Sequence, residues 1–389
     1  MRILFAFFLL CLSFCARAQQ DTSRIRISVL TCGTGEELYT TFGHSGVRVV
    51  DSNAQTDLVY NYGLFNFSDP DFYSKFTRGK LLYFVGTESF PDFMSTYQYE
   101  KRNVAEEVMN VGMADKQRII QYLKENLKPE NRSYQYDFLF DNCATRIRDI
   151  FPNTLDTSFR YGAVLNAKKV TFRAILNEYL RANHWSRLGI NILLASKIDR
   201  EMTDEEAMFL PDMLYTGLRT ATYHQKVLMS EITTIYKGAD KPKLGPNKPL
   251  WMMMALLLLV LLVFFVRPLR RLKNILSFTL LLLSGALGCF ILFMWFGTDH
   301  KSCDNNYNIL WAFPLNLIVA FTMFKPRKWH IKYSLFAIGL LMVALLIHSA
   351  GIQVMPLIEL LPFFVSLLYI YMYMYKRALA AYAAQAKPR

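Results

Sequence analysis

The sequence predicts an α+β domain of about 230 residues followed by an all-α bundle of five transmembrane helices. Three observations support this class. Short alternating segments and helical periodicities share the first two thirds of the chain, and five apolar stretches follow residue 249. In addition, 53% of the 389 residues are hydrophobic, which is more than a single soluble domain of ordinary composition contains.

The first 18 residues have the pattern of a secretory signal peptide. Met1-Arg2 precede an apolar run, and Ala16-Arg17-Ala18 supplies a small-x-small cleavage signal. Cys15 suggests a lipoprotein signal, but Phe14 stands where that signal needs a small residue. We therefore expect cleavage after residue 18 and an exported mature protein.

Residues 19–237 are predicted to form the exported catalytic domain. Alternating apolar residues over 24–30 predict a strand, and 47–50 with 58–62 predict a hairpin around the turn at 51–53. Further strands are expected at 80–85, 104–111, 134–140 and 227–236. Helices are expected at 35–42, 71–77, 90–99, 114–123, from 143 onward, and at 172–182, 188–195 and 204–220. The Pro-, Gly- and Lys-rich segment 238–249 is predicted to be a linker with little structure.

The membrane domain is predicted to span residues 250–375. Its apolar stretches, each close to the roughly 20 residues that cross a bilayer, are 250–266, 274–296, 309–324, 333–350 and 359–375. The segments after the first, third and fifth stretches carry twelve Lys and Arg, whereas the loops 297–308 and 351–358 carry only Lys301. By the positive-inside rule, the N-terminal domain is periplasmic and residues 376–389 form a cytoplasmic tail of an inner-membrane protein.

The formal charge of +13 reflects this topology. Residues 250–389 contain 13 Lys and Arg against 3 Asp and Glu, whereas residues 19–249 contain 29 against 28. The exported domain is therefore nearly neutral, and its charge gives no support for a nucleic-acid partner.

The cysteines do not form a disulfide framework. Of six, two leave with the signal peptide and Cys289 lies in an apolar stretch. The exported side keeps Cys32, Cys143 and Cys303, an odd and sparse set that favours a reactive thiol. A bridge between Cys32 and Cys303 remains open.

Cys143 is the candidate nucleophile. It opens a predicted helix, where the helix dipole and unpaired N–H groups favour a thiolate. Asp141 is a candidate N-cap, Asn142 precedes the thiol, and Arg146 follows one turn later. The alternative is a small buried side chain at a helix start, since free cysteines are commonly buried.

His44 is the candidate general base. Gly43 and Gly46 flank it and permit close approach of a substrate or another backbone. Asn61, on the second strand of the predicted hairpin, would lie beside His44 and orient its imidazole. The alternatives are that His44 has only a structural role and that Asn61 only forms a hydrogen bond beside a turn.

Four further residues are assigned to substrate binding. Asn142 and Ser45 adjoin the candidate nucleophile and base, and Asp299 and His300 lie in a polar loop on the catalytic side of the membrane. The alternative is that this loop only connects two apolar stretches and is exposed to solvent. A zinc site there is disfavoured because His300 and Cys303 supply only two ligands, and the proposed chemistry requires no metal or other cofactor.

The order of histidine, a polar residue one strand later, and Asn-Cys at a helix start resembles the circularly permuted papain-like families, which include the lecithin–retinol acyltransferase-like enzymes. The resemblance implies a nucleophile at Cys143, a base at His44 and an orienting residue at Asn61. The acyltransferases commonly place a second histidine at the third position, so the asparagine departs from their pattern and matches papain itself.

A closer resemblance covers nearly the whole chain. Several motifs look like those of the Bacteroides-type lipoprotein N-acyltransferase (Lnb) family: Thr34-Gly35-Glu36, Phe42-Gly43-His44-Ser45, Asn61-Tyr62-Gly63, Asp141-Asn142-Cys143-Ala144, Phe209-Leu210-Pro211-Asp212 and Thr298-Asp299-His300. This family resemblance implies transfer of a phospholipid acyl chain to the N-terminal amine of a diacylated lipoprotein.

Three functions remain open at this stage. The first is a membrane-bound acyltransferase that acts through a Cys143 thioester on lipoproteins. The second is an envelope cysteine amidase or peptidase that acts on peptidoglycan or protein with the same residues. The third is a non-enzymatic envelope protein. The two enzymes differ in the acceptor, which is an amine in one case and water in the other.

Overall fold

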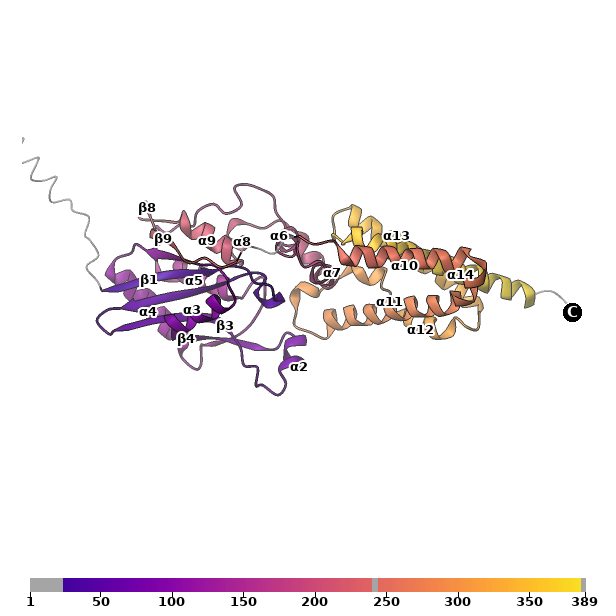
Figure 1. The fold of residues 1–389 in the computed structure, drawn as a ribbon, viewed down its shortest axis with the longest axis horizontal. Coiled ribbons are helices and arrows are strands. Elements are labelled where there is room, and N and C mark those ends of the chain that lie inside the picture. The colour runs from indigo at the N-terminus through magenta and orange to yellow at the C-terminus, as the bar shows by residue number, and fades with distance from the viewer. Residues whose placement is uncertain (1–23, 240–243, 386–389) are drawn as a thin grey trace, which may run out of the picture.

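A computed structural model describes residues 24–239 and 244–385. The predicted signal peptide, part of the predicted linker and the last four residues lie outside this range. Figure 1 shows an α+β domain at one end of an elongated molecule and a helical bundle at the other. The expected order of the two parts is therefore confirmed.

The α+β domain is built on an antiparallel sheet with the strand order β6-β4-β3-β2-β1-β5-β9. The hairpin predicted around residues 51–53 is present as β2 and β3. The strands are β1 Ile25–Cys32, β2 His44–Asp51, β3 Thr56–Leu64, β4 Leu82–Ser89, β5 Val104–Met109, β6 Ser133–Gln135 and β9 Met229–Tyr236, with a separate short pair β7 Thr222–Tyr223 and β8 Lys226–Val227.

Helices cover both faces of this sheet. Apolar residues of α4, α5 and α9 pack against one face of the sheet and form the main core with it. Helix α3 packs against the other face of the sheet in a smaller cluster. The helices are α2 Phe72–Thr77, α3 Phe90–Tyr99, α4 Met113–Leu127, α5 Cys143–Thr154, α6 Phe172–Tyr179, α7 His184–Leu193, α8 Asp204–Ala207 and α9 Pro211–Arg219.

Several bounds differ from those expected, including those of β4 and α7, and three expected elements differ in kind. The helix over 35–42 is only a 3-10 turn, Leu38–Thr40. The strand over 134–140 ends at Gln135, because the Asp137 carboxylate accepts the N–H groups of Leu139 and Phe140 and turns the chain. The helix over 204–220 is split into α8 and α9, since Pro211 holds the preceding residue in an extended conformation.

A buried arginine fastens the segments that lie nearest the bundle. Arg173 of α6 makes a bidentate ion pair with Asp199 at 2.7 and 2.9 Å, and both side chains are buried. The same guanidinium donates to Asn191 Oδ1 and to the carbonyls of Leu194 and Ala195. One side chain therefore joins α6, α7 and the 3-10 turn Ser196–Asp199.

Within the described residues, four helices are long and apolar enough to cross a membrane: α10 Lys248–Phe265, α11 Lys273–Phe296, α13 Lys328–Ser349 and α14 Leu357–Gln385. The third predicted stretch is shorter. It forms a 3-10 turn, Tyr307–Leu310, and α12, Leu315–Thr322, with Pro314 as the N-cap of α12. The expected count of five spanning helices is therefore not confirmed. The predicted linker ends early, since α10 begins at Lys248, and α14 continues into the predicted tail.

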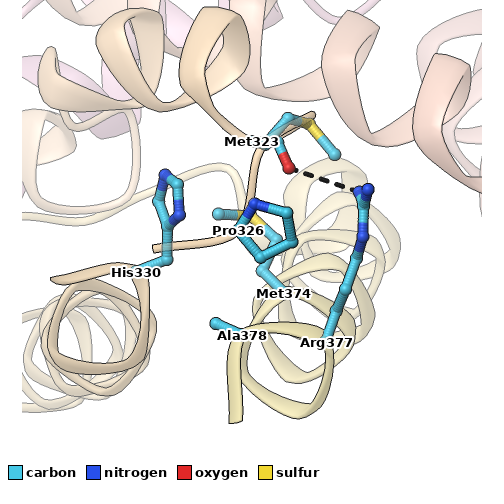
Figure 2. A pocket seen from close by; sticks show the side chains of 6 residues that line it. All are labelled: Met323, Pro326, His330, Met374, Arg377 and Ala378. Atoms are coloured by element: carbon cyan, nitrogen blue, oxygen red, sulfur yellow. Dashed lines mark hydrogen bonds between the residues drawn. The ribbon is translucent and has the colours of Figure 1, made fainter. Parts of the chain in front are cut away.

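The third stretch nevertheless connects the two ends of the bundle. At its start, Asn306 donates to the carbonyls of Ile192 and Leu193 in α7. Beyond its end, Arg377 of α14 donates to the carbonyls of Met323 and Phe324 at the far end of the bundle. Figure 2 shows this far end, where the cavity of about 10 Å³ has room for no more than a single water molecule.

The α+β domain and the bundle also contact each other directly. Arg187 of α7 pairs with buried Glu359 of α14 at 2.6 Å, and Glu359 also accepts from Asn247, the N-cap of α10. The Ala195 N–H donates to the Ser302 carbonyl at 2.8 Å. The predicted tether is thus only one of several connections between the two parts.

Candidate active site

Cys143 is the first residue of α5, as expected, but the residue that caps this helix is Asn142. The Asn142 side chain accepts the Thr145 N–H at 3.0 Å, and the Thr145 hydroxyl accepts the Asn142 N–H at 2.7 Å. This reciprocal pair fixes the first turn of the helix. The prediction that Asp141 caps the helix is wrong, because its carboxylate instead pairs with Arg146 at 2.7 Å.

The remaining polar group of Asn142 is also engaged. Its amide nitrogen donates to the carbonyls of Phe138 and Phe209 at 2.7 and 2.9 Å, and the side chain is buried. No polar atom of this side chain is left for a substrate. The structure thus supports a role in holding Cys143 in place instead of the expected role in substrate binding.

His44 is the first residue of β2, and the preceding glycine determines where the strand begins. Gly43 has φ of +81°, and a Cβ at that position would stand 2.7 Å from the Cys32 carbonyl oxygen. Only glycine fits this backbone conformation and this close approach to β1. The sequence-based suggestion that Gly43 permits close approach is confirmed, with another backbone as the neighbour.

Cys143 lies where strands β2 and β3 separate. Their ladder ends at the pair Gly46–Asn61, although β2 begins two residues earlier and β3 continues to Leu64. At Gly63, which has φ of +91°, a Cβ would stand 3.8 Å from Cys143 Cβ. The Ser45 N–H hydrogen-bonds to the Cys143 sulfur from the other strand. The sheet itself therefore opens to admit the thiol.

The structure brings His44, Asn61 and Cys143 together. His44 Nε2 lies 2.7 Å from Asn61 Oδ1, and Asn61 Nδ2 donates to Glu88 Oε1 at 2.7 Å. Because the Asn61 amide nitrogen donates to Glu88, its oxygen accepts the Nε2–H of His44. Nδ1 is then the ring nitrogen that faces Cys143, with which the imidazole hydrogen-bonds.

Cys143 and His44 shift each other's pKa toward the charged forms. Burial alone would raise the pKa of the Cys143 thiol, but the adjacent His44 and the N–H groups of Ser45 and Ala144 lower it below its usual value. Burial acts in the opposite sense on His44, yet the Cys143 thiolate and the bond to Asn61 raise the pKa of the imidazole. Each partner therefore stabilises the charged form of the other.

Replacing Asn61 with alanine is expected to narrow the pH range of activity. Asn61 raises the pKa of His44, so its loss lowers that pKa, and the alkaline limb of the kcat/KM profile moves to lower pH. At the optimum we expect a loss of about tenfold, the value of one hydrogen bond to a charged group. The matched control is Asn126→Ala, which removes a half-buried amide bonded to Tyr62. An alkaline limb that does not move would contradict the role of Asn61.

Tyr134 and Glu88 belong to the site and were missed from the sequence. The hydroxyl of Tyr134 is buried and has no hydrogen-bond partner among the described residues. It lies 3.9 Å from the point where a Gly63 Cβ would stand, and Cys143 Cβ lies 3.8 Å from the same point. Burial and the nearby thiolate keep the pKa of Tyr134 well above its usual value, so its proton is retained.

The side chains of the other three residues predicted to bind substrate form no described contact with the candidate catalytic pair. Ser45 is buried, and because side chains alternate along a strand, its hydroxyl faces away from the side that holds His44. Its N–H, not its side chain, reaches the thiol. Asp299 and His300 contact the end of α2, through the Arg78 and Phe76 carbonyls. No described contact joins either residue to the candidate catalytic pair.

Two further sequence-based questions concern the remaining cysteines and metal binding. Cys32 and Cys303 are both buried free thiols and are not bridged to each other. Burial raises the pKa of Cys303 to about 12 and that of Cys32 still further, so neither is a thiolate at neutral pH. Among residues 24–239 and 244–385, no group of three or more His, Cys, Asp and Glu side chains is placed to hold a metal ion.

A cleft of about 260 Å³ lies between the catalytic domain and the loop after α11. Its cations are largely paired, since Lys197 contacts Asp304 and Arg200 contacts Glu206. The residues that line it are Phe140, Ser196, Lys197, Ile198, Arg200, Lys301 and Ser302.

Comparison with known families gives two matches. The family described as Lnb N-terminal periplasmic domain matches residues 15–178, and the family described as Lnb transmembrane domain matches residues 241–380. The first match includes His44, Asn61 and Cys143. The comparisons found no match among curated proteins and none among solved structures. The two matched segments follow the chain in the same order as the two structural parts.

Proposed function

Because this chain belongs to the Lnb family, we propose that it is a membrane-bound acyltransferase that moves an acyl chain from a phospholipid to the N-terminal amine of lipoproteins. Family membership indicates a membrane enzyme of lipoprotein maturation with an N-terminal periplasmic domain. The observation that carries the chemical assignment is the connected set Cys143–His44–Asn61–Glu88 at the opening between β2 and β3. Its arrangement of nucleophile, base and orienting amide supports a permuted papain-like domain.

In the first step, the Cys143 thiolate attacks the ester carbonyl of the phospholipid. A carbon–sulfur bond forms, and the negative charge moves to the carbonyl oxygen. When the tetrahedral intermediate collapses, the carbon–oxygen bond of the ester breaks and His44 gives its proton to the departing lysophospholipid alkoxide. The products are a Cys143 thioester, a lysophospholipid and a neutral imidazole.

In the second step, the lipoprotein amine attacks the thioester carbonyl. A carbon–nitrogen bond forms, the carbon–sulfur bond breaks, and neutral His44 accepts the proton that the amine loses. This restores the thiolate–imidazolium pair and releases an amide. An acceptor water would give hydrolysis instead, which is the amidase or peptidase alternative.

We further propose that Tyr134 donates a hydrogen bond to the oxygen that becomes negative in both steps. Replacing Tyr134 with phenylalanine is expected to slow thioester formation about 100-fold, the loss typical of one oxyanion donor. Rapid quenching followed by intact-protein mass measurement gives this rate. The matched control is Tyr161→Phe, because Tyr161 donates to the Arg148 carbonyl away from the thiol. A variant that unfolds more readily but forms thioester at the normal rate would show a purely structural role for Tyr134.

The membrane part belongs to the same proposal. We propose that the third stretch crosses the bilayer together with the four long helices, supported by its contacts at both ends of the bundle. With five crossings, the charge pattern supports a cytoplasmic C-terminus and a periplasmic catalytic domain in an inner-membrane protein. The predicted signal peptide, with the mature chain beginning at residue 19, is part of this topology.

The experiment that tests the function is mass spectrometry of lipoprotein N-termini. Cells that lack the gene are expected to accumulate diacylated lipoproteins with a free amine, and the wild-type gene should restore the third acyl chain. Complementation with His44→Ala should leave the amine free. Unchanged N-acylation in the deleted strain would overturn the proposal, and altered peptidoglycan fragments would favour the amidase alternative.

A further inference from the structure

Helix α2 lies where the catalytic domain meets the outer end of the bundle, as Figure 1 shows. The Asp299 N–H donates to the Arg78 carbonyl at 2.8 Å, and His300 Nε2 donates to the Phe76 carbonyl at 3.2 Å. Both donors lie within four residues after Phe296, the last residue of α11. These contacts place α2 at the level where a spanning helix leaves the bilayer.

The exposed surface of α2 and the segment before it is aromatic. Phe67 and Tyr73 are 74% and 81% exposed, and Phe76 is also exposed. Arg78 and Lys80 beside them are exposed cations that form no ion pair with any described residue. Aromatic rings next to basic side chains are typical of protein surfaces at the level of lipid head groups.

This surface continues inward as a chain of packed rings. Phe67 contacts Phe65 at a centroid distance of 4.5 Å, and Phe65 contacts Tyr83 at 5.1 Å. Tyr83 stacks on Tyr136 at 4.3 Å. Tyr136 and Cys143 pack against the same core cluster, and burial together with the Cys143 thiolate raises the pKa of the Tyr136 hydroxyl. We call this set the aromatic strip: Phe65, Phe67, Phe72, Tyr73, Phe76, Tyr83 and Tyr136.

We propose that the aromatic strip is the surface on which the acyl chain of an outer-leaflet phospholipid leaves the bilayer and reaches Cys143. The inference rests on the proposed function for the fate of the chain, but the binding itself needs no reaction. The outer rings would lie at the height of the lipid, Arg78 and Lys80 would face the phosphate, and the inner ring packs against the same core cluster as Cys143. The strip thereby shields an apolar chain from water along its route to the nucleophile.

The first test is photo-crosslinking with the full chain in vesicles of phosphatidylethanolamine and phosphatidylglycerol that contain a phospholipid with a diazirine on its acyl chain. The protein carries Cys143→Ala, so labelling does not depend on acyl transfer. We expect labelled peptides from residues 65–76 and 133–140, and about tenfold less label there in Phe67→Ser/Tyr73→Ser, since burial of two aromatic rings is lost.

The control is Tyr99→Ser, which removes a ring that is 89% exposed at the end of α3. It should label like the unmodified chain. Label confined to the bundle, or to residues 196–200 and 301–302 around the 260 Å³ cleft, would overturn the proposal. The proposal would also be overturned if the aromatic strip is labelled equally in the double variant and in the chain without the two serines.

The second test separates this inference from the proposed function. With Cys143 intact, Phe67→Ser/Tyr73→Ser should acylate Cys143 from vesicle phospholipid about tenfold more slowly, yet react normally with a water-soluble acetyl thioester. Equal rates of acylation from phospholipid in the double variant and the unmodified chain would contradict this inference and leave the proposed function unaffected. If the unmodified chain takes no acyl group from either donor, the proposed function fails, and the crosslinking result still decides whether lipid occupies the strip.

Discussion

Replacing Cys143 with alanine is expected to abolish thioester formation and N-acylation, with a loss of at least about 10⁴-fold in kcat/KM. The reason is that both steps of the proposed mechanism pass through the bond between this sulfur and the acyl carbon, which forms in the first step and breaks in the second. Intact-protein mass spectrometry after incubation with phospholipid vesicles should show an added acyl mass on the unmodified chain and none on the variant.

Two controls make this result specific. Cys32→Ala should keep activity if the variant folds, because burial leaves the Cys32 thiol protonated. The alanine at position 143 should leave thermal unfolding nearly unchanged, since Asn142 still caps α5 through Thr145. Acylation that persists in Cys143→Ala would place the nucleophile elsewhere and refute the mechanism.

Replacing Arg173 with methionine is expected to destabilise the catalytic domain by about 3–5 kcal/mol, because Asp199 is then left as an unpaired buried charge. The change should lower the midpoint of thermal unfolding of the full chain in detergent by about 10 °C. Loss of the arginine also releases the carbonyls of Leu194 and Ala195.

An exposed ion pair at the C-terminal end of α6 provides the control for this loss of stability. Arg181 pairs with Glu178 in solvent, so Arg181→Met should cost no more than about 1 kcal/mol. The double variant Arg173→Met/Asp199→Leu should recover much of the loss, since an apolar pair of similar volume avoids the buried charge. Equal midpoints for Arg173→Met and Arg181→Met would contradict the assigned role.

Much of the fold could be predicted from local patterns. The hairpin of β2 and β3, helix α3 and the start of α5 depend on alternation, turn residues and periodicity within about ten residues. The grouping of His44, Asn61 and Cys143 was predicted because the hairpin brings the first two together. Cys143 was predicted from its place at a helix start, and the family resemblance implied the same three residues.

Long-range contacts account for what was missed. Tyr134 comes near Cys143 only because β6 pairs with β4, and Glu88 reaches Asn61 only across the β3–β4 ladder. Neither position carries a sequence signal of its own. The cap of α5 was misassigned because Asp141 and Asn142 are both good capping residues. Their tertiary partners decided between them: Arg146 pairs with the aspartate, and Phe209 accepts from the asparagine.

The direct contacts between the two parts of the molecule have a further consequence. Arg187 with Glu359, Asn306 with α7, and Ala195 with Ser302 hold the α+β domain in one position relative to the helical bundle. A domain on a loose tether would sample amines throughout the periplasm. Under the proposed function, a domain fixed in this way would reach those acceptors whose reactive amine is held at the matching height by lipid chains in the same membrane.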